Sequence, residues 1–289
     1  MYHIRQDKSD NQIKRNTFFS SRGGTQTARR QRAHRAPANV LRRLEVVDLD
    51  LLGVKEGDRV LDIGCGAGRL MLRQARRGCR VTGIDLVERD LPRARRLLEG
   101  AGQRADLIVG DAGRLPFQAE TFDCVSCTET LAHLADDRMA LREIARVLRG
   151  GGRAVMSVPE PLPELLIFSL SEMYRTDPWG HRRIFSRGGI VRAAEEAGLE
   201  VYATRRRNSV EAVYWLLLFL LDACPPLRER GVDALNRWRE RSNTEPYSLL
   251  YHVLDEAGNR FFPKSFVVYA QKPPARRRES ERAARRGGP

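Results

Sequence analysis

Short apolar runs alternate along the chain with longer stretches in which apolar residues recur at helical spacing. The short runs predict strands, and the helical stripes predict amphipathic helices that cover the resulting sheet. No pattern recurs at a fixed period, so the sequence does not indicate a repeat protein. The predicted strands are a run beginning at Val60 and residues 80–85, 105–112, 122–129, 199–204 and 266–270, and the predicted helices are residues 38–52, 68–78, 89–100, 136–149 and 186–197, the last with Ser186 as its cap.

The most informative segment is the loop that follows the first strand. It reads D-x-G-x-G-x-G, with Asp62, Gly64, Gly66 and Gly68 at the fixed positions. Glycine has no Cβ, so the backbone of such a loop can approach a bulky ligand, and the next helix presents unpaired N–H groups. The second strand ends in Asp85, where a ribose-binding carboxylate falls in a βαβ nucleotide fold. These positions predict a nucleotide-binding site.

Two classes of cofactor fit this loop, a dinucleotide and S-adenosylmethionine. The dinucleotide fingerprint G-x-G-x-x-G requires a third glycine where this chain has Arg69. The acid at the start of the loop, Asp62, would repel a pyrophosphate but attract the cationic amino group of a methionine. The charge pattern therefore favours S-adenosylmethionine.

Five segments together resemble the class I S-adenosylmethionine-dependent methyltransferases, especially the group related to the ubiquinone and menaquinone biosynthesis methyltransferases. They cover about residues 45–160 in the family's order and read VLDIGCGAGR, GIDL, VGDAGRLPF, FDCVSCTETLAHL and LREIARVLRGGGRAVMSVPE. The resemblance implies S-adenosylmethionine as the cofactor and a Rossmann-like α/β fold. That fold has a seven-stranded, mostly parallel sheet of order 3-2-1-4-5-7-6 whose last strand is antiparallel.

The same resemblance implies a role for each matching position. The glycine loop holds the methionine end of the cofactor, and the acid after the second strand holds the ribose hydroxyls. The third strand ends at the adenine, and the fourth ends beside the methionine and the acceptor. In this order, the implied cofactor-binding residues are Asp62, Gly64, Cys65, Gly66 and Gly68, then Asp85 and Leu86, then Asp111 and Ala112, and finally Thr128 and Glu129.

The region between the last two predicted strands is longer than the short hairpin usual in this fold. Residues 205–264 have helical periodicity, with Ser209 as a predicted helix cap and an apolar run at residues 213–221. This run is too short to span a bilayer. It predicts a buried helix of an inserted subdomain, an apolar wall for a lipid-like acceptor, or a helix for peripheral membrane contact. We expect a methyltransferase domain over residues 38–271, with this helical insertion before its last strand.

The formal net charge of +14 lies mainly in two arginine-rich tails. Residues 1–37 hold nine Lys and Arg against two acids, and residues 272–289 hold seven against two. Both lack apolar periodicity, so we expect disordered, solvated tails; the alternative is an arm for RNA or for an anionic membrane surface. Residues 1–37 contain no apolar stretch typical of a secretory signal, which favours a cytoplasmic location.

The cysteines and histidines predict neither a metal nor a redox site. Cys124 and Cys127 have C-x-x-C spacing, but residues three apart on a strand face opposite sides of the sheet. Cys65 lies inside the cofactor loop, and methyl transfer from a sulfonium needs no covalent enzyme intermediate, so we expect it to serve packing. The five histidines are scattered in the sequence, and none pairs with another at ligand spacing.

A hydroxyl acceptor must lose its proton, and two histidines are the candidate catalytic bases. His133 comes just after the fourth strand, and imidazole titrates near neutrality. The alternative is that His133 only hydrogen-bonds locally. His181 follows the fifth strand in a segment that, by resemblance to related enzymes, folds over the acceptor mouth together with Tyr174 and Trp179. The alternative there is a loop that its aromatic residues fasten to the sheet.

Three functions remain open at this stage. The first is transfer of a methyl group, by expectation to oxygen, on a small-molecule or lipid-like acceptor. The second is methylation of RNA, suggested by the basic tails; against it, the fourth strand lacks the Asn/Asp-Pro-Pro-aromatic run usual in enzymes that methylate base amines. The third is a non-catalytic module that binds S-adenosylmethionine. Fold analogy indicates the reaction class but neither the acceptor nor the oligomeric state.

Overall fold

The computed structural model describes residues 46–170, 180–222, 231, 233, 234, 237 and 247–274. All of them belong to the compact unit of residues Pro37–Pro289. Three sets of predictions lie outside the described residues and stay predictions: the tails up to residue 37 and from residue 275, the first part (residues 38–45) of the helix predicted over residues 38–52, and the lid residues Tyr174 and Trp179. The described part of that helix prediction is wrong for residues 46–48, because Asp48 caps a short helix that begins at Leu49.

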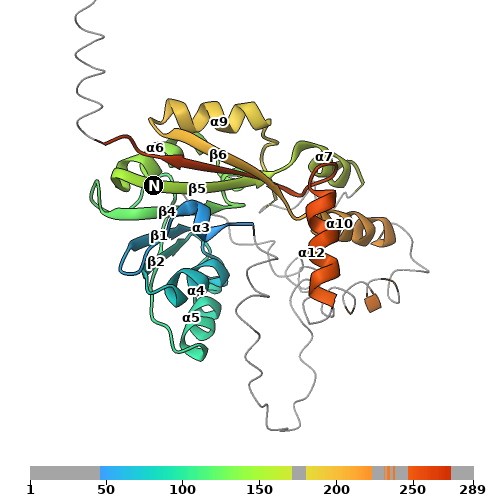
Figure 1. Ribbon diagram of the computed structural model, residues 1–289, viewed down its shortest axis with the longest axis horizontal. Coiled ribbons are helices and arrows are strands. Elements are labelled where there is room, and N and C mark those ends of the chain that lie inside the picture. Colours follow the sequence, from blue (N-terminus) through green and yellow to red (C-terminus); the bar gives the residue numbers. More distant parts are fainter. Residues whose placement is uncertain are drawn as a thin grey trace, which may run out of the picture. The chain divides into compact units, whose positions relative to one another are not determined.

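A seven-stranded sheet forms the centre of this unit (Figure 1). The strands lie in the order β3-β2-β1-β4-β5-β7-β6, and β7 runs antiparallel to both of its neighbours. All other neighbouring pairs are parallel. The order and the direction of the last strand confirm the predicted fold. The strands are β1 (Arg59–Ile63), β2 (Arg80–Asp85), β3 (Asp106–Val109), β4 (Phe122–Thr128), β5 (Leu148–Pro159), β6 (Glu200–Arg207) and β7 (Ser265–Gln271).

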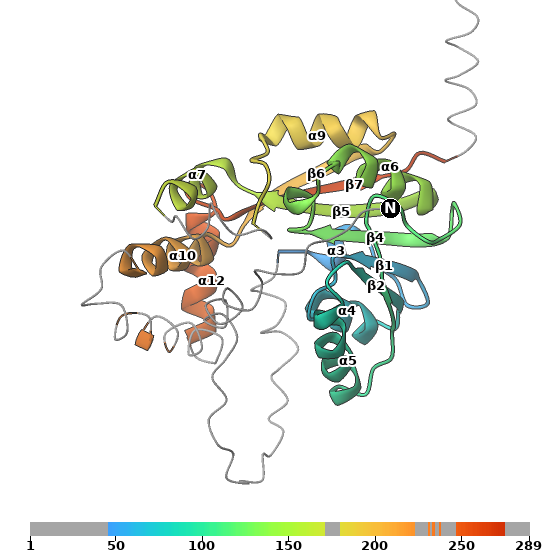
Figure 2. The same ribbon diagram turned by 180° about the vertical axis from the view of Figure 1, so that it is seen from behind.

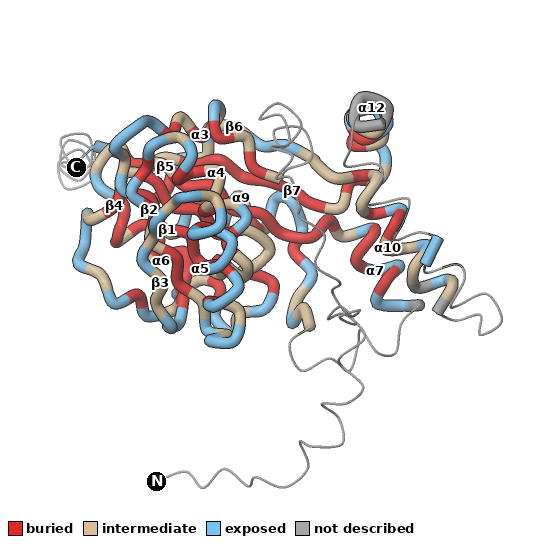
Figure 3. Tube along the Cα trace, turned by 90° about the horizontal axis from the view of Figure 1, so that it is seen from below, coloured by how far each residue is buried: buried red, intermediate tan, exposed pale blue. Residues whose placement is uncertain are grey.

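Helices cover both faces of the sheet (Figures 1 and 2). Side chains alternate along a strand, so consecutive residues of β1 enter different cores. Val60 packs in the core beneath α3 (Leu49–Leu52), α4 (Arg69–Arg76) and α5 (Leu91–Gly100), whereas Leu61 packs in the core beneath α6 (Asp137–Val147) and α9 (Arg187–Glu196). Figure 3 shows the buried residues concentrated along the strands between these layers.

Side-chain caps fix where the helices begin. The hydroxyl oxygen of Ser186 accepts a hydrogen bond from Gly189 N at 3.0 Å, which confirms the predicted start of α9. Asp136 accepts from Met139 N in the same way at the start of α6. The predicted helix over residues 136–149 ends earlier, at Val147, because Leu148 already pairs with Phe122 as the first residue of β5.

Three helices lie together beyond one end of the sheet, as Figure 2 shows: α7 (Pro161–Leu170), α10 (Ser209–Asp222) and α12 (Tyr247–Gly258). The predicted capping role of Ser209 is wrong. Ser209 is the first residue of α10, and its hydroxyl donates to the carbonyl of Asp255 at 2.9 Å. The cap comes from α12 instead, because the Asp255 carboxylate accepts from Val210 N. Of the three helices, α10 and α12 lie within the predicted insertion of residues 205–264, whereas α7 belongs to the segment directly after β5.

Two boundaries differ from the prediction, the end of β6 and the start of the C-terminal tail, because charged residues pair there inside the fold. β6 continues through Arg207, since its arginines pair with carboxylates such as Glu160 and Glu256. The sequence assigns Lys272 to the C-terminal tail, yet Lys272 is buried and its ammonium group donates to the carbonyl of Leu148 at 2.6 Å. None of the helices in the described part of the chain is long and apolar enough to cross a membrane.

Candidate active site

The glycine loop joins β1 to α4 in a left-handed backbone. Gly64, Gly66 and Gly68 have φ angles of 70°, 49° and 77°. A Cβ on Gly64 would lie 2.0 Å from the hydroxyl oxygen of Thr130, so no larger residue fits there. A Cβ on Gly66 would meet nothing within 4 Å, so this part of the loop faces open space. The loop is therefore closed towards the protein and open on the side where a ligand can approach.

Asp85 ties the end of β2 to this loop. One carboxylate oxygen accepts from Gly66 N and the other from Val87 N, both at 2.8 Å. Leu86, next to it, leaves 59% of its surface exposed despite being apolar. The carboxyl end of β2 thus presents a fixed carboxylate beside an exposed apolar side chain. This arrangement suits a ribose, the role that the family resemblance implies for Asp85.

Asp62 is buried below the loop rather than facing solvent. Its Oδ1 accepts from the hydroxyl of Ser126 on β4 at 2.6 Å, and Ser126 in turn accepts from Gln74 at 3.1 Å. Burial raises the pKa of Asp62 to about 7; the Ser126 hydrogen bond opposes this shift, and the nearby charge of Asp85 adds to it. This carboxyl therefore keeps its proton at pH values where an exposed aspartate is ionised, and a cationic group bound at the loop would favour its ionised form.

Asp111 and Ala112 follow β3 on the same edge of the sheet. The Asp111 carboxylate accepts from Gly113 N at 2.8 Å, which fixes a tight turn. Gly110 N donates to the carbonyl of Asp85 at 3.0 Å, so this turn lies next to the end of β2. Asp111 is exposed and Ala112 is buried. The structure thus brings these two residues together with Asp85, as the sequence predicted.

Thr128 and Glu129 mark the end of β4. Glu129 has a φ of 54°, a left-handed conformation that is costly for a residue with a side chain. Ser157 on β5 fixes this conformation, because its hydroxyl donates to the Glu129 carboxylate at 2.7 Å and its carbonyl accepts from Glu129 N at 3.1 Å. Strained residues of this kind concentrate at functional sites. Thr128 and Glu129 lie beside the glycine loop at the carboxyl edge of the sheet, because β4 pairs there with β1.

The cysteines behave as predicted for packing residues. Burial raises the pKa of the Cys65 thiol well above its usual range, and the charges of Asp62 and Asp85 raise it further. Cys124 and Cys127 lie in different cores on opposite faces of the sheet. Burial raises the pKa of each of these two thiols to about 12. Among the described residues, no group of three or more His, Cys, Asp or Glu could hold a metal ion.

His133 and His181 meet in the folded chain, although they are far apart in the sequence. His133 ends the short helix η3 (Leu131–His133) after β4, and its ring centroid lies 4.5 Å from that of His181. The fold brings the segment after β5 back against the end of β4, and the spacing of the two histidines in the sequence does not indicate this contact. His181 also contacts Glu164 of α7, with 2.5 Å between Nδ1 and Oε1.

Sequence reasoning missed the supporting residues Glu164, Ser126, Gln74 and Ser157. All four are polar and lie at 4% exposure or less. Ser126 and Gln74 sit among apolar residues of a strand and a helix, so a buried polar residue at a core position is the signal that could have identified them. Nothing in the sequence around Glu164 indicates that it contacts a histidine.

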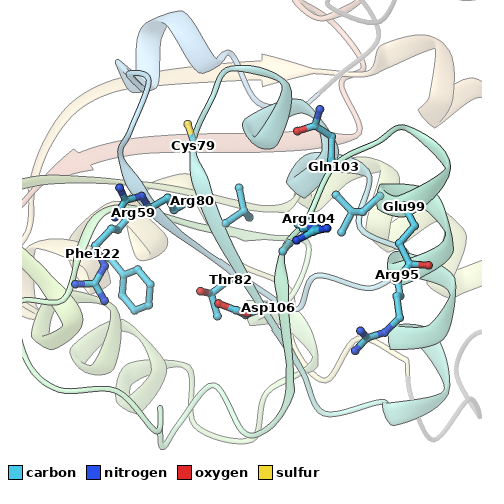
Figure 4. Close-up of a pocket in the computed structure, with 13 residues that line it drawn as sticks. Arg59, Cys79, Arg80, Thr82, Arg95, Glu99, Gln103, Arg104, Asp106 and Phe122 are labelled. Atoms are coloured by element: carbon cyan, nitrogen blue, oxygen red, sulfur yellow. The ribbon is translucent and has the colours of Figure 1, made fainter.

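A hollow lies at the edge of the sheet opposite the glycine loop, where the first residues of β1, β2, β3 and β4 meet (Figure 4). Its volume is about 800 Å³. Arginines and polar groups line it, and none of the implied cofactor residues does. This hollow is therefore separate from the candidate active site. Its lining residues are Arg59, Cys79, Arg80, Val81, Thr82, Arg95, Leu98, Glu99, Gln103, Arg104, Ala105, Asp106 and Phe122.

Known proteins share both the sequence pattern and the fold of this chain. The methyltransferase domain family matches residues 61–156. The ubiquinone biosynthesis O-methyltransferase of Aeromonas salmonicida is 34% identical over 175 residues, which cover 56% of this chain and 72% of that protein. The chain belongs to the class I S-adenosylmethionine-dependent methyltransferases. It is therefore an enzyme, and its cofactor is S-adenosylmethionine.

A second relative and a solved structure are also similar to this chain. The 27-O-demethylrifamycin SV methyltransferase of Amycolatopsis mediterranei is 38% identical over 118 residues, covering 38% of this chain and 43% of that protein. The crystal structure of the cyclase SpnF matches with a TM-score of 0.54 and 21% identity, over 78% of this chain and 80% of its own. The likeness to SpnF shows the fold alone, and the reaction must be argued from the site.

The residues of this methyltransferase fit its cofactor. The left-handed glycine loop leaves open space at Gly66, a carboxylate is fixed at the end of β2, and a buried acid lies below the loop. S-adenosylmethionine supplies an activated methyl group on a sulfonium, so the protein has mainly to orient an acceptor towards it. The individual contacts of Asp62, Asp85, Asp111 and Glu129 with the cofactor remain proposals.

Proposed function

We propose that this methyltransferase transfers the methyl group to a hydroxyl oxygen of a small molecule that has an apolar part. The observation that carries the proposal is the pair of histidine rings, 4.5 Å apart, at the end of β4. A neutral alcohol or phenol attacks poorly, and removing its proton during the transfer contributes about 10²- to 10⁴-fold to the rate. Imidazole is suited to this task near neutral pH.

The named relatives support oxygen as the acceptor atom. The Aeromonas relative is named as an O-methyltransferase of ubiquinone biosynthesis, and the Amycolatopsis relative as a methyltransferase of 27-O-demethylrifamycin SV. Both names describe methyl transfer to an oxygen of a small molecule. We infer an acceptor of the same chemical class for this chain.

Exposed apolar side chains on α7, α10 and α12 support an acceptor with an apolar part. Soluble proteins seldom expose many large apolar residues on neighbouring elements unless the surface binds something. A polar metabolite would lose its water against such residues without gaining hydrogen bonds. These residues, each at least 37% exposed, are Leu162, Leu165, Leu166 and Phe168 on α7, Val213, Leu217 and Leu220 on α10, and Val253 and Leu254 on α12.

The experiment uses the full chain, S-adenosylmethionine with a deuterated methyl group, and alkylcatechols whose alkyl chain grows from methyl to octyl. The expected product is a mono-O-methyl ether that carries the labelled methyl group, with a KM that falls as the alkyl chain lengthens. Matched alkylanilines test transfer to nitrogen. Methylation of the anilines but not of the catechols would overturn the assignment to oxygen, and a KM independent of chain length would overturn the apolar contact.

The same exposed apolar residues favour a second candidate role, peripheral contact with a lipid surface. The proposal predicts that the full chain sediments with vesicles of an anionic phospholipid and that Leu217→Asp weakens this binding. Leu97→Asp on α5, which has a comparable exposed apolar side chain on another element, serves as the control. Equal sedimentation of the wild type, Leu217→Asp and Leu97→Asp would contradict contact between these apolar residues and a lipid surface.

A further inference from the structure

His181, one of the two catalytic candidates, makes a close polar contact with Glu164. The Nδ1 atom of His181 lies 2.5 Å from Oε1 of Glu164. The side chains leave only 15% and 5% of their surface exposed, respectively. A carboxylate removed from water in this way interacts more strongly with a neighbouring donor than an exposed one does. The pair therefore has the geometry of a short, charge-assisted hydrogen bond.

This contact determines which nitrogen of His181 carries the proton. An ionised carboxylate can only accept a hydrogen bond, so Nδ1 of His181 must be the donor. The neutral ring then has its proton on Nδ1 and its basic lone pair on Nε2. Free histidine prefers the opposite arrangement, so the neighbour sets the tautomer here. His181 is thus held in the form in which Nε2 can take a proton.

His133 has the same tautomer for a different reason. Its Nδ1 lies 3.3 Å from the carbonyl oxygen of Gly180, and a carbonyl also only accepts. A neutral carbonyl, however, stabilises a positive imidazolium less than a carboxylate does. His133 is also exposed, whereas His181 is largely buried. Of the two rings, His181 is the one that contacts a buried carboxylate.

The segment that carries His181 is fastened to the end of β4. Arg182 N donates to the carbonyl of Ala132 at 2.8 Å. The guanidinium of Arg183 donates to the carbonyls of Leu134 and Ala135 and pairs with Asp137. These bonds hold the segment against η3 and the residues that follow it. The position of His181 relative to the strand ends is therefore fixed by the backbone, and the orientation of its ring by Glu164.

We propose that Glu164 is a positioning residue that makes His181, rather than His133, the general base of this methyltransferase. The proposal rests on the proposed function, since only a hydroxyl acceptor needs a base. In the transfer, the acceptor oxygen bonds to the methyl carbon, the carbon–sulfur bond breaks, and its electron pair stays on sulfur. The hydroxyl proton moves to Nε2 of His181, and Glu164 stabilises the resulting imidazolium.

The first test measures the tautomer and needs no acceptor. Nitrogen-15 NMR of the full chain is recorded at about pH 8.5, well above the usual imidazole range, and His181→Gln identifies the His181 signals among those of the five histidines. We expect the wild-type ring to carry its proton on Nδ1. Glu164→Ala should move it to Nε2, whereas Glu164→Gln should keep it on Nδ1, because the glutamine oxygen still accepts.

The control for this test is Glu160→Gln. Glu160 precedes Glu164 by one helical turn and is equally buried, but it pairs with Arg187 and Arg206 instead of a histidine. Its loss should lower the melting temperature without changing the His181 tautomer. A wild-type proton on Nε2, or a Glu164→Ala variant that keeps the proton on Nδ1, would overturn the proposal.

The second test measures kcat with butylcatechol as the acceptor. His181→Ala should lower kcat by about 100-fold, and Glu164→Ala by about 10- to 100-fold, with the cofactor Kd unchanged. Glu164→Gln should be impaired less than Glu164→Ala. If His181→Ala lowers kcat and Glu164→Ala does not, the positioning role is wrong while the proposed function stands. If His181→Ala and His133→Ala both leave kcat unchanged, the proposed base itself is wrong.

Discussion

The carboxylate of Asp62 lies 2.6 Å from the hydroxyl of Ser126, and this pair is buried between β1 and β4 directly below the glycine loop. Burial raises the pKa of Asp62 from 3.8 to about 7. The folded protein therefore holds a proton that the unfolded chain has already released between these two pH values. The stabilisation due to this proton is complete below about pH 4 and is lost as the pH rises through about 7.

Asp62→Asn removes this titration and keeps the shape of the side chain. We expect the variant to lose the pH dependence of stability between about pH 4 and pH 7, and to be more stable than the wild type at pH 8 by about 1–3 kcal/mol. Urea unfolding followed across this pH range checks the prediction. Stability curves of the two proteins that run parallel over the whole range would contradict it.

Asp85 is expected to control the affinity for the cofactor. Charge-assisted hydrogen bonds contribute about 1.5–3 kcal/mol each in favourable sites, so Asp85→Ala should weaken binding by roughly tenfold or more. Calorimetric titration with S-adenosylhomocysteine measures this change. Asp106→Ala is the control, because Asp106 is an acid at the first residue of the neighbouring strand β3 and lies in the hollow at the opposite edge. Equal affinity of Asp85→Ala and wild type would remove this carboxylate from the cofactor site.

Trp215 is expected to affect the acceptor and not the cofactor. Its indole N–H donates to Glu211 at 3.1 Å, and its ring contacts Tyr214 on the same helix. If α10 forms part of the acceptor wall, Trp215→Ala should raise the KM for butylcatechol by roughly tenfold, because a large aromatic surface is lost. The Kd of S-adenosylhomocysteine should stay the same. An unchanged KM in a folded variant would show that this helix only fills the core.

The basic tails are expected to be dispensable for catalysis. Deleting residues 1–35 and 275–289 removes most of the excess positive charge while keeping every strand of the sheet. Turnover of butylcatechol and cofactor affinity should stay within a few-fold of the values for the full chain. Methylation of RNA by the full chain, lost on this deletion, would instead favour a nucleic-acid substrate.

The sequence predicted the elements that depend on contiguous residues. The turn from Asp62 to Gly68 was readable because a strand, a left-handed loop and a helix follow one another directly, and the cap at Ser186 was readable for the same reason. The sheet order came from the family resemblance, since pairing between distant strands leaves no local pattern.

The errors arose where a distant residue overrides a local preference. Ser209 has the chemistry of a helix cap, but Asp255 of α12 caps α10 in its place. The sequence does not indicate the contact between His133 and His181, because only folding brings these distant residues together. Glu164 was missed for the same reason, because its contact with His181 leaves no pattern in the sequence.

The most direct test of the account compares the histidine variants on an oxygen acceptor and a nitrogen acceptor that carry the same butyl chain. Butylcatechol must lose a proton from oxygen as the methyl group arrives, whereas butylaniline already carries a basic lone pair on nitrogen. We predict that the wild type methylates butylcatechol on oxygen and that the variant with both His133→Ala and His181→Ala loses about 100-fold or more in kcat, with an unchanged cofactor Kd. A double variant that methylates butylcatechol at the wild-type rate would contradict the proposed function.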